Sequence, residues 1–475
     1  KTATATITFT KEGVHTVTVT AKDAAGNEMP EFTTEPQVID RTAPIAGAQY
    51  ADPMGSTDDT LYYAGPFTAT LKVTDTNLDP ADITVMDNGE VVSGLVWAQD
   101  ANDPAVWTAV CTVSGEGEHI LTMTAHDRAK NEMEPYTSPN LLIIDQTPPV
   151  SEVKYADPMG GTDDVLYYGG AFKVTLSITD VNLDPADITV MDNGEVVSGL
   201  EWKPEGKRPT VWTAICTVSG EGEHTVTMTA LDRAKNEMEP FTSKKLIIDE
   251  TAPIAGAQYA EPKSSRDGKD YYDGEFEARF TVTDVNLDPA DITVMDNGTE
   301  ITGLVWTQDE ADPTVWTASC TVSGEGEHTL TMTAHDRAKN EMTPYTSPKI
   351  LVIDQTAPVI NVIYGNTDVK NTVDGISYFD REQTATIEIT EANFSAENVT
   401  LTVTAKDVTG KDIATEDFLA ALHDAQKWSH ENGKHTATVS FPVEANYTLS
   451  VACTDLADRK AEDYGPDAFT VDATA

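Results

Sequence analysis

The chain has few cysteines and no long hydrophobic stretch. Its 475 residues include four cysteines, each more than 100 residues from the next: Cys111, Cys216, Cys320 and Cys453. Cysteines this isolated argue against a disulfide framework, so we predict buried free thiols that pack as small apolar residues. No segment contains the roughly 20 consecutive apolar residues that a membrane-spanning helix needs.

Positive charge is also scarce. The chain has 31 Lys and Arg residues against 79 Asp and Glu residues, which gives a formal net charge of −48. Binding to nucleic acid or to an anionic membrane requires basic patches, so we expect no nucleic-acid partner and no direct membrane contact. The sequence also lacks Gly-x-Ser-x-Gly, a phosphate-binding loop and Cys-x-x-Cys, and we do not predict an enzyme.

What the chain does have is a long internal repeat. The motif Asp-x-Thr-Ala/Pro-Pro begins at Asp40, Asp145, Asp249 and Asp354, in steps of 105, 104 and 105 residues. Repeats of this length indicate a tandem array of small domains. We therefore divide the chain into a partial module at 1–42, which holds only C-terminal strands, and modules 1 to 4 at 43–147, 148–251, 252–356 and a divergent 357–475. Because the first unit lacks its N-terminal half, we expect the array to belong to a longer chain.

The sequence pattern of each module predicts an all-β fold. Polar and apolar residues alternate over Thr68–Thr74, as in a half-buried strand, and Asn88-Gly89 is a strong hairpin signal. About seven short strands per module favour an immunoglobulin-like β-sandwich. In module 1 we expect strands at Phe67–Thr74, Ile83–Met86, Val106–Val113, Ile120–Ala125 and Leu141–Ile144, and in module 4 a short helix at Asp417–Lys427.

Linkers between the modules are short. Only two or three residues separate each motif Asp from the Pro that opens the next module, and Pro restricts both itself and its predecessor to extended geometry. We therefore expect a tandem array of immunoglobulin-like β-sandwich modules that forms an extended rod.

The pattern Asp23-Ala-Ala-Gly-Asn27, followed by Asp40-x-Thr-Ala-Pro, resembles the tandem bacterial immunoglobulin-like (Big) domains of large surface proteins and adhesins. Modules 1 to 3 depart from it, with Asp-Arg-Ala-Lys-Asn in place of Asp-Ala-Ala-Gly-Asn. The resemblance covers essentially the whole chain. It implies an extracellular protein, secreted or anchored to the cell wall, and some members of the family bind calcium where domains meet.

Acidic residues are placed to converge at each junction. In an immunoglobulin-like module, the B–C and F–G loops lie at the same end as the N-terminus, so both loops should meet the incoming linker Asp. Calcium takes six to eight oxygen ligands from carboxylates, amides and carbonyls, and we predict it there. Asp and Asn also cap turns, which is the alternative explanation. The predicted ligands are Asp40, Asp75, Asn77, Asp127 and Asn131; Asp145, Asp180, Asn182, Asp232 and Asn236; Asp249, Asp284, Asn286, Asp336 and Asn340; and Asp354, Glu391, Asn393, Asp455 and Asp458.

These features favour a stalk or spacer whose modules contact their neighbours in the same longer chain. One alternative is a set of modules that bind a carbohydrate or protein on a host or bacterial surface. Each of modules 1 to 3 has a Trp pair that could stack on sugars, although packing against the core is the commoner role, and the divergent module 4 carries Trp428. A second alternative is a self-assembling filament subunit. The acidic tract Asp52–Asp59 is expected to be a solvated loop.

Overall fold

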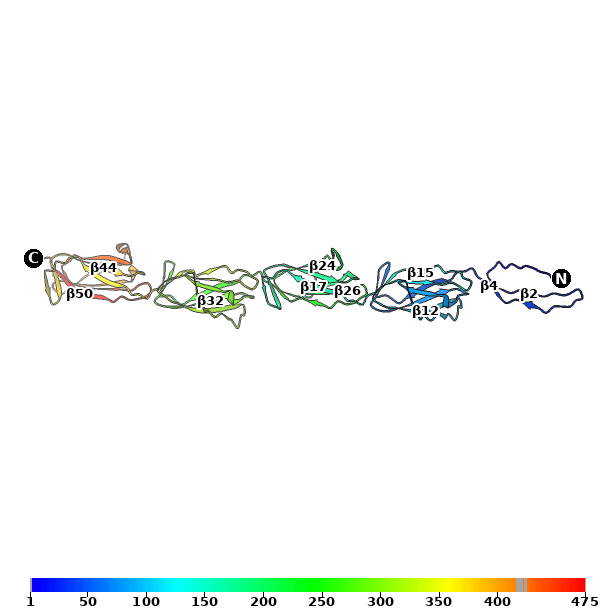
Figure 1. The fold of residues 1–475 in the computed structure, drawn as a ribbon. Helices are drawn as coiled ribbons and strands as arrows, with labels where there is room; N and C mark the ends of the chain where they lie inside the picture. Colours follow the sequence, from blue (N-terminus) through cyan, green and yellow to red (C-terminus); the bar gives the residue numbers. More distant parts are fainter. Residues whose placement is uncertain (1, 416–421, 423–424, 475) are drawn as a thin grey trace. The chain divides into compact units, whose positions relative to one another are not determined.

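The computed structural model describes residues 2–415, 422 and 425–474 (Figure 1). The chain forms two compact units. The first extends to Ile248, except for Met159–Gly161 and Tyr167–Gly169, and these two segments belong with the residues from Asp249 onward to the second unit. Strands dominate both units. Most of the expected helix at Asp417–Lys427 lies outside the described residues, and its end forms the 3-10 turn η4 (Ala425–Lys427).

Module 1, in the first unit, is a two-layer sandwich. Its first layer is one antiparallel sheet in the order β11 (Ala98–Gln99), β12 (Val106–Val113), β8 (Phe67–Thr74) and β5 (Ile45–Tyr50). The second layer contains two further sheets. In one sheet the strand order is β10 (Glu90–Val91), β9 (Thr84–Asp87), β14 (Leu121–Thr124) and β15 (Tyr136–Thr137). In the other sheet the order is β13 (Gly117–His119), β16 (Leu141–Ile144), β7 (Thr60–Tyr63) and β6 (Gly55–Ser56).

The two sheets of the second layer share interrupted strands. Only Ile120 separates β13 from β14, and three residues separate β15 from β16. The pairs β13–β16 and β14–β15 are therefore two parts of one antiparallel strand pair, and β7 adds to it in parallel. This strand order is that of an immunoglobulin-like sandwich.

The core of module 1 follows the alternation seen in the sequence. Successive strand residues point to opposite faces, and Phe67, Ala69, Leu71 and Val73 of β8 are buried while the residues between them are not. Leu121 and Met123 of the other layer pack into the same cluster. Cys111 is also part of it and is a free thiol, as predicted.

Module 2 and the partial module contain the other described strands before module 3. Module 2 repeats the sandwich with strands β17 (Val150–Tyr155), β20 (Phe172–Thr179), β24 (Arg208–Val218), β23 (Lys203–Glu205), β22 (Glu195–Val196), β21 (Leu183–Asp192), β26 (Val226–Asp232), β27 (Phe241–Thr242), β18 (Gly160–Gly161), β19 (Val165–Tyr168), β28 (Lys245–Ile248) and β25 (Gly222–His224). The partial module contributes two antiparallel pairs, β1 (Gly13–His15) with β4 (Gln37–Ile39) and β2 (Thr18–Val19) with β3 (Phe32–Thr33).

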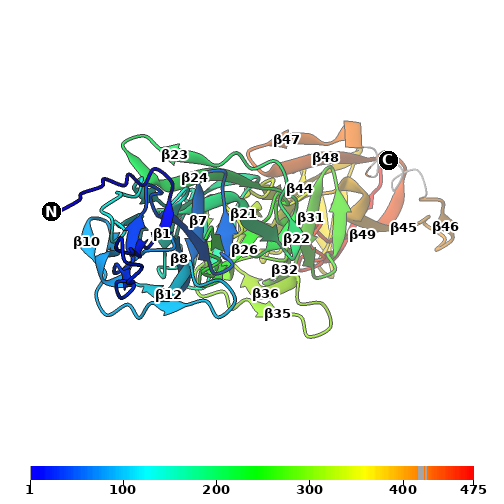
Figure 2. The ribbon, with the colours of Figure 1, turned by 90° about the vertical axis from the view of Figure 1, so that its right-hand side faces the viewer.

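Modules 3 and 4 lie in the second unit. Module 3 is built from β29 (Ile254–Tyr259), β30 (Ser264–Arg266), β31 (Lys269–Tyr272), β32 (Phe276–Thr283), β33 (Thr293–Asp296), β34 (Thr299–Glu300), β35 (Thr307–Gln308), β36 (Val315–Val322), β37 (Gly326–His328), β38 (Leu330–Thr333), β39 (Tyr345–Thr346) and β40 (Ile350–Ile353). Module 4 contains two sheets. The four-stranded sheet has the order β41 (Val359–Tyr364), β44 (Gln383–Thr390), β48 (Lys434–Phe441) and β47 (Ser429–Glu431). The six-stranded sheet has the order β42 (Asn371–Val373), β43 (Ile376–Phe379), β50 (Tyr464–Val471), β49 (Ala445–Cys453), β45 (Val399–Lys406) and β46 (Asp412–Ile413). Figure 2 shows β47 and β48 side by side.

The aromatic residues that could have formed a binding platform pack inward. Trp97 and Trp107 lie partly buried against the core of module 1, and Trp306 and Trp316 do the same in module 3. Trp428 of module 4 is buried and donates a hydrogen bond from Nε1 to the carbonyl oxygen of Leu422 at 2.6 Å. These indoles therefore contribute to the packing of their modules.

Candidate metal centres at the module junctions

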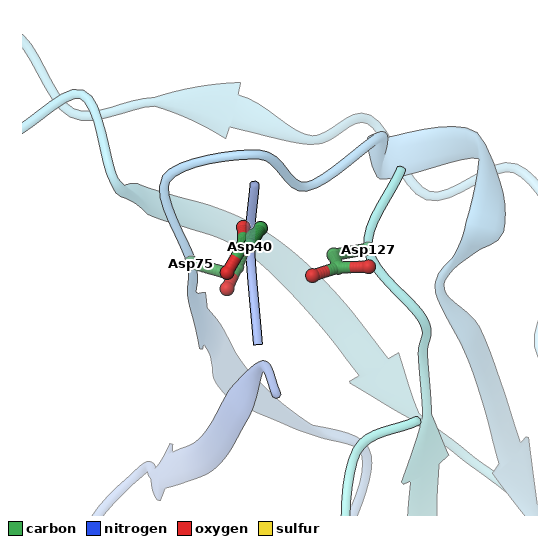
Figure 3. A group of neighbouring side chains, drawn as sticks. All are labelled: Asp40, Asp75 and Asp127. Atoms are coloured by element: carbon green, nitrogen blue, oxygen red, sulfur yellow. The ribbon is translucent and has the colours of Figure 1, made fainter. Parts of the chain in front are cut away.

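Three segments that are distant in sequence carry the acidic side chains of the first junction. Asp40 follows β4, Asp75 follows β8, and Asp127 lies in the loop after β14. An isolated bridge between Leu78 and Asp127 holds the two loops together. The three carboxylates each offer an oxygen within 4.8 Å of the other two, and Figure 3 shows Asp127 facing Asp40 and Asp75.

The same group of three acids recurs at each later junction, and within each group the oxygens again lie within 4.8 Å of one another. Every acid in these later groups is buried. The structure thus brings together three sequence-distant acids from each of the four predicted sets. The groups are Asp145, Asp180 and Asp232; Asp249, Asp284 and Asp336; and Asp354, Glu391 and Asp455.

The predicted asparagines lie at the same clusters. Asn182 donates from Nδ2 to Oδ2 of Asp145 at 2.5 Å, and Asn77, Asn286 and Asn393 contact their linker Asp in the same way. Asn236 donates from Nδ2 to Oδ2 of Asp232 at 2.7 Å and to the linker carbonyl of Asp145 at 2.8 Å, and Asn131 and Asn340 repeat both bonds. Each amide also carries an oxygen, so a rotation of the side chain would turn a ligand atom toward the acids.

Turn chemistry uses one oxygen of most of these acids. Oδ1 of Asp180 accepts from the backbone N–H of Asn182 at 2.7 Å, and Oδ1 of Asp232 accepts from that of Asn236 at 2.9 Å. Oδ1 of Asp145 accepts from the N–H of Thr147 at 3.0 Å. The turns therefore orient the carboxylates.

Burial raises the pKa of several of these carboxyl groups. Burial, reinforced by the charges of Asp145 and Asp232, raises the pKa of Asp180 to about 7. Burial is also the main reason that the pKa of Glu391 rises to about 7 and that of Asp455 to about 6. At Asp127 burial acts in the same direction, but hydrogen bonds from Asn131 and the backbone outweigh it and the pKa lies below its usual value.

Asp458, predicted as a ligand of the fourth set, lies apart from the other acids of that set. It lies three residues beyond Asp455, is exposed, and has a left-handed backbone conformation (φ 67°), so it stands outside the group formed by Asp354, Glu391 and Asp455. Arg459 takes the position of Asn236, and its guanidinium instead donates to the carbonyl oxygen of Asp273. Oδ2 of Asp455 is left buried without a hydrogen-bond partner among the described residues.

Sequence reasoning missed a tie between the linker and the preceding module. Thr147 of the Asp-x-Thr motif donates from its hydroxyl to Oε1 of Glu116 at 2.5 Å, and Thr356 makes the same bond to Glu325. The repeated Gly-Glu-Gly turn was the available signal. Asp145 and Asp354 are thus fixed on one side by their own modules and on the other by loops of the next.

Comparisons with known proteins add structural likeness only. No family model matches the chain, and no curated protein matches it. Among solved structures, it is similar to an ICAM-5 ectodomain fragment at 11% identity and a TM-score of 0.36, covering 90% of this chain and 99% of that one. It is also similar to bovine butyrophilin (9% identity, TM-score 0.25, 42% and 98% covered) and to tandem Ig domains of titin (12%, 0.20, 44% and 97%).

The strand order described above defines the class: the chain is an all-β, tandem array of immunoglobulin-like β-sandwiches. In the part of the chain that the structure describes, no helix has the length and apolar character needed to cross a membrane.

Proposed function

We propose that the chain is a stalk or spacer segment of an extracellular, adhesin-like bacterial surface protein, and that calcium binds at its module junctions and limits their bending. The observation that carries the proposal is the group of three acids repeated at four junctions. Carboxylates held this close repel one another unless a positive charge lies among them.

The second junction supports a cation most directly. Asp145, Asp180 and Asp232 are all buried, and none forms an ion pair with Lys or Arg among the described residues. Their donor set is all oxygen, with the Asn182 and Asn236 amides and the Asp145 backbone adjacent. Oxygen-only sets with tolerant geometry suit calcium.

Such an ion would limit bending because of where its ligands come from. Asp145 belongs to the linker, Asp180 to the loop after β20, and Asp232 to the end of β26. One cation bound to all three would join the linker to two loops of the next module. A spacer needs that restraint, because its length depends on the angle between successive modules.

Calorimetric titration of the full chain with calcium tests the binding, and small-angle scattering in calcium and in EDTA tests the mechanical role. We expect heat of binding from wild type and a larger radius of gyration in calcium. Asp180→Asn should remove one site, whereas Asp163→Asn, an exposed acid of the same module, should remove none. A flat wild-type titration would refute the calcium sites, and identical scattering in both buffers would refute the mechanical role.

A further inference from the structure

A second contact joins modules 1 and 2 inside the first unit, apart from the acids. Tyr62 and Ile143 of module 1 form a small apolar cluster with Ala234 of module 2, whose side chain is 0% exposed. The guanidinium carbon of Arg233 lies 6.0 Å from the centre of the Tyr62 ring, at the limit of a cation–π contact. The strands β6 and β7 thus face the loop Asp232–Asn236.

Gly55 marks how closely the two modules approach. A Cβ added at Gly55 would lie 2.1 Å from the carbonyl oxygen of Arg233, closer than any real contact. The backbone of Gly55 is not left-handed, so its own conformation does not require glycine. The requirement comes from the neighbouring module.

Module 1 provides an internal comparison for the loop. Ala129 and Arg128 occupy the positions of Ala234 and Arg233, but Ala129 is exposed. The Arg128 side chain is 70% exposed and that of Arg233 31%. The module that precedes module 1 is the partial module. Its described residues form only β1–β4 and contain no equivalent of the β6–β7 hairpin. The hairpin therefore accounts for the burial of Ala234.

The junction between modules 3 and 4, within the second unit, has the same apolar cluster, but the residues around the cluster differ. Tyr271, Val352 and Ala457 repeat the apolar cluster. Ser264 stands at the position of Gly55 and donates from Oγ to the carbonyl oxygen of Leu456, which stands at the position of Arg233, at 2.5 Å.

Two further polar contacts support this second version. Arg266 donates from Nη1 to Oγ of Ser395 at 3.0 Å, and Arg459 donates to the carbonyl oxygen of Asp273. The residues on both sides of the junction have thus changed together.

We propose that the hairpin and the facing loop form a metal-independent lock between consecutive modules, and that the lock before module 4 is a second version that cannot be exchanged with the first. The proposal rests on the spacer function and adds a source of stiffness that needs no calcium. It also gives the array a defined order, because a loop fitted to a glycine hairpin leaves no room for a serine side chain.

Limited trypsin digestion of the protein comprising residues 1–475, carried out in EDTA and followed by mass spectrometry, tests the lock. In wild type we expect cleavage after Arg233 to be at least about tenfold slower than cleavage after the uncovered Arg128, and tenfold corresponds to about 1.4 kcal/mol of opening. Gly55→Val should accelerate cleavage after Arg233 severalfold. Gly47→Val is the matched control, because nothing lies within 4 Å of a Cβ added at Gly47.

Ala234→Asp tests the same contact from module 2, and hydrogen exchange of β8 and β20 reports whether modules 1 and 2 of each variant remain folded. Gly55→Ser should also open the first junction, although Ser264 is native at the second. The lock is refuted if Arg233 is cleaved as fast as Arg128 in EDTA, or if neither Gly55→Val nor Ala234→Asp accelerates cleavage. Protection of Arg233 in Gly55→Ser would refute the claim that the two versions differ. A flat calcium titration leaves all of these outcomes unaffected.

Discussion

Replacing Asp180 with Asn separates the charge of the second acidic group from its turn chemistry. The substitution keeps an oxygen that can accept the 2.7 Å hydrogen bond from the N–H of Asn182. It removes a buried carboxylate whose pKa is raised from 3.8 to about 7. The turn should therefore survive, while repulsion from Asp145 and Asp232 is reduced.

The magnitude follows from linkage. A carboxyl group with a raised folded-state pKa contributes stability that is fully present below its unfolded pKa, near 4, and is lost as the pH rises through about 7. Three pKa units correspond to roughly 4 kcal/mol as an upper limit. In EDTA at pH 8, Asp180→Asn should stabilise module 2 by up to that amount, and at pH 4 the gain should vanish. In calcium the variant should lose the stabilisation that the ion gives wild type.

Because several modules unfold in one chain, the assay must report on module 2 alone. Protein equilibrated in urea can be labelled with a brief pulse of deuterium, and peptides from β20 and β24 followed by mass spectrometry. Asp163→Asn serves as the control. If Asp180→Asn is no more stable than wild type in EDTA at pH 8 and responds normally to calcium, these acids only cap turns.

Three other predictions use the same chain. Calcium at about 100 times its dissociation constant should add about 2.7 kcal/mol per site to wild-type stability, measured by melting in calcium and in EDTA. Equal melting curves would contradict it. Calorimetry should show that Asp455→Asn weakens calcium binding at the fourth group and that Asp458→Asn does not. Equal effects of the two substitutions would mean that Asp458 is also a ligand. Burial raises the pKa of the Cys216 thiol, so it should react with a thiol reagent only after unfolding; rapid labelling of native protein would contradict its place in the core.

The strands were predictable because alternation and burial act over a few adjacent residues. β8, β12 and β16 have the expected bounds, whereas β9 begins one residue late. The delay has a local cause: Pro80–Asp82 forms a 3-10 turn, capped by the Asp79 side chain, and Ile83 ends it. The convergence of the acids was predictable for a different reason, since the order of strands determines which loops share one end of a sandwich.

Two features were harder to predict, one for a local reason and one for a long-range reason. Asp458 occupies the left-handed backbone position that Gly26 holds in the partial module. The glycine at that position indicated that the residue there shapes the turn and does not need a side chain that binds an ion. Most of Asp52–Asp59 is exposed as expected, but Gly55 contacts a loop more than 170 residues away. No pattern within one repeat reports that contact.

Turn capping and cation binding were alternatives when only the sequence was considered, but the geometry makes them compatible. In Asp145 and Asp232, Oδ1 is used by the local backbone and Oδ2 by an asparagine amide of the cluster. The backbone bonds hold each carboxylate against its neighbours, and burial raises the pKa of Asp232. The carboxylates of such a site lose little conformational freedom when an ion arrives, because the backbone bonds already order them and only the asparagine amides must rotate. The turns would thus supply the preorganisation that a calcium-stiffened junction requires.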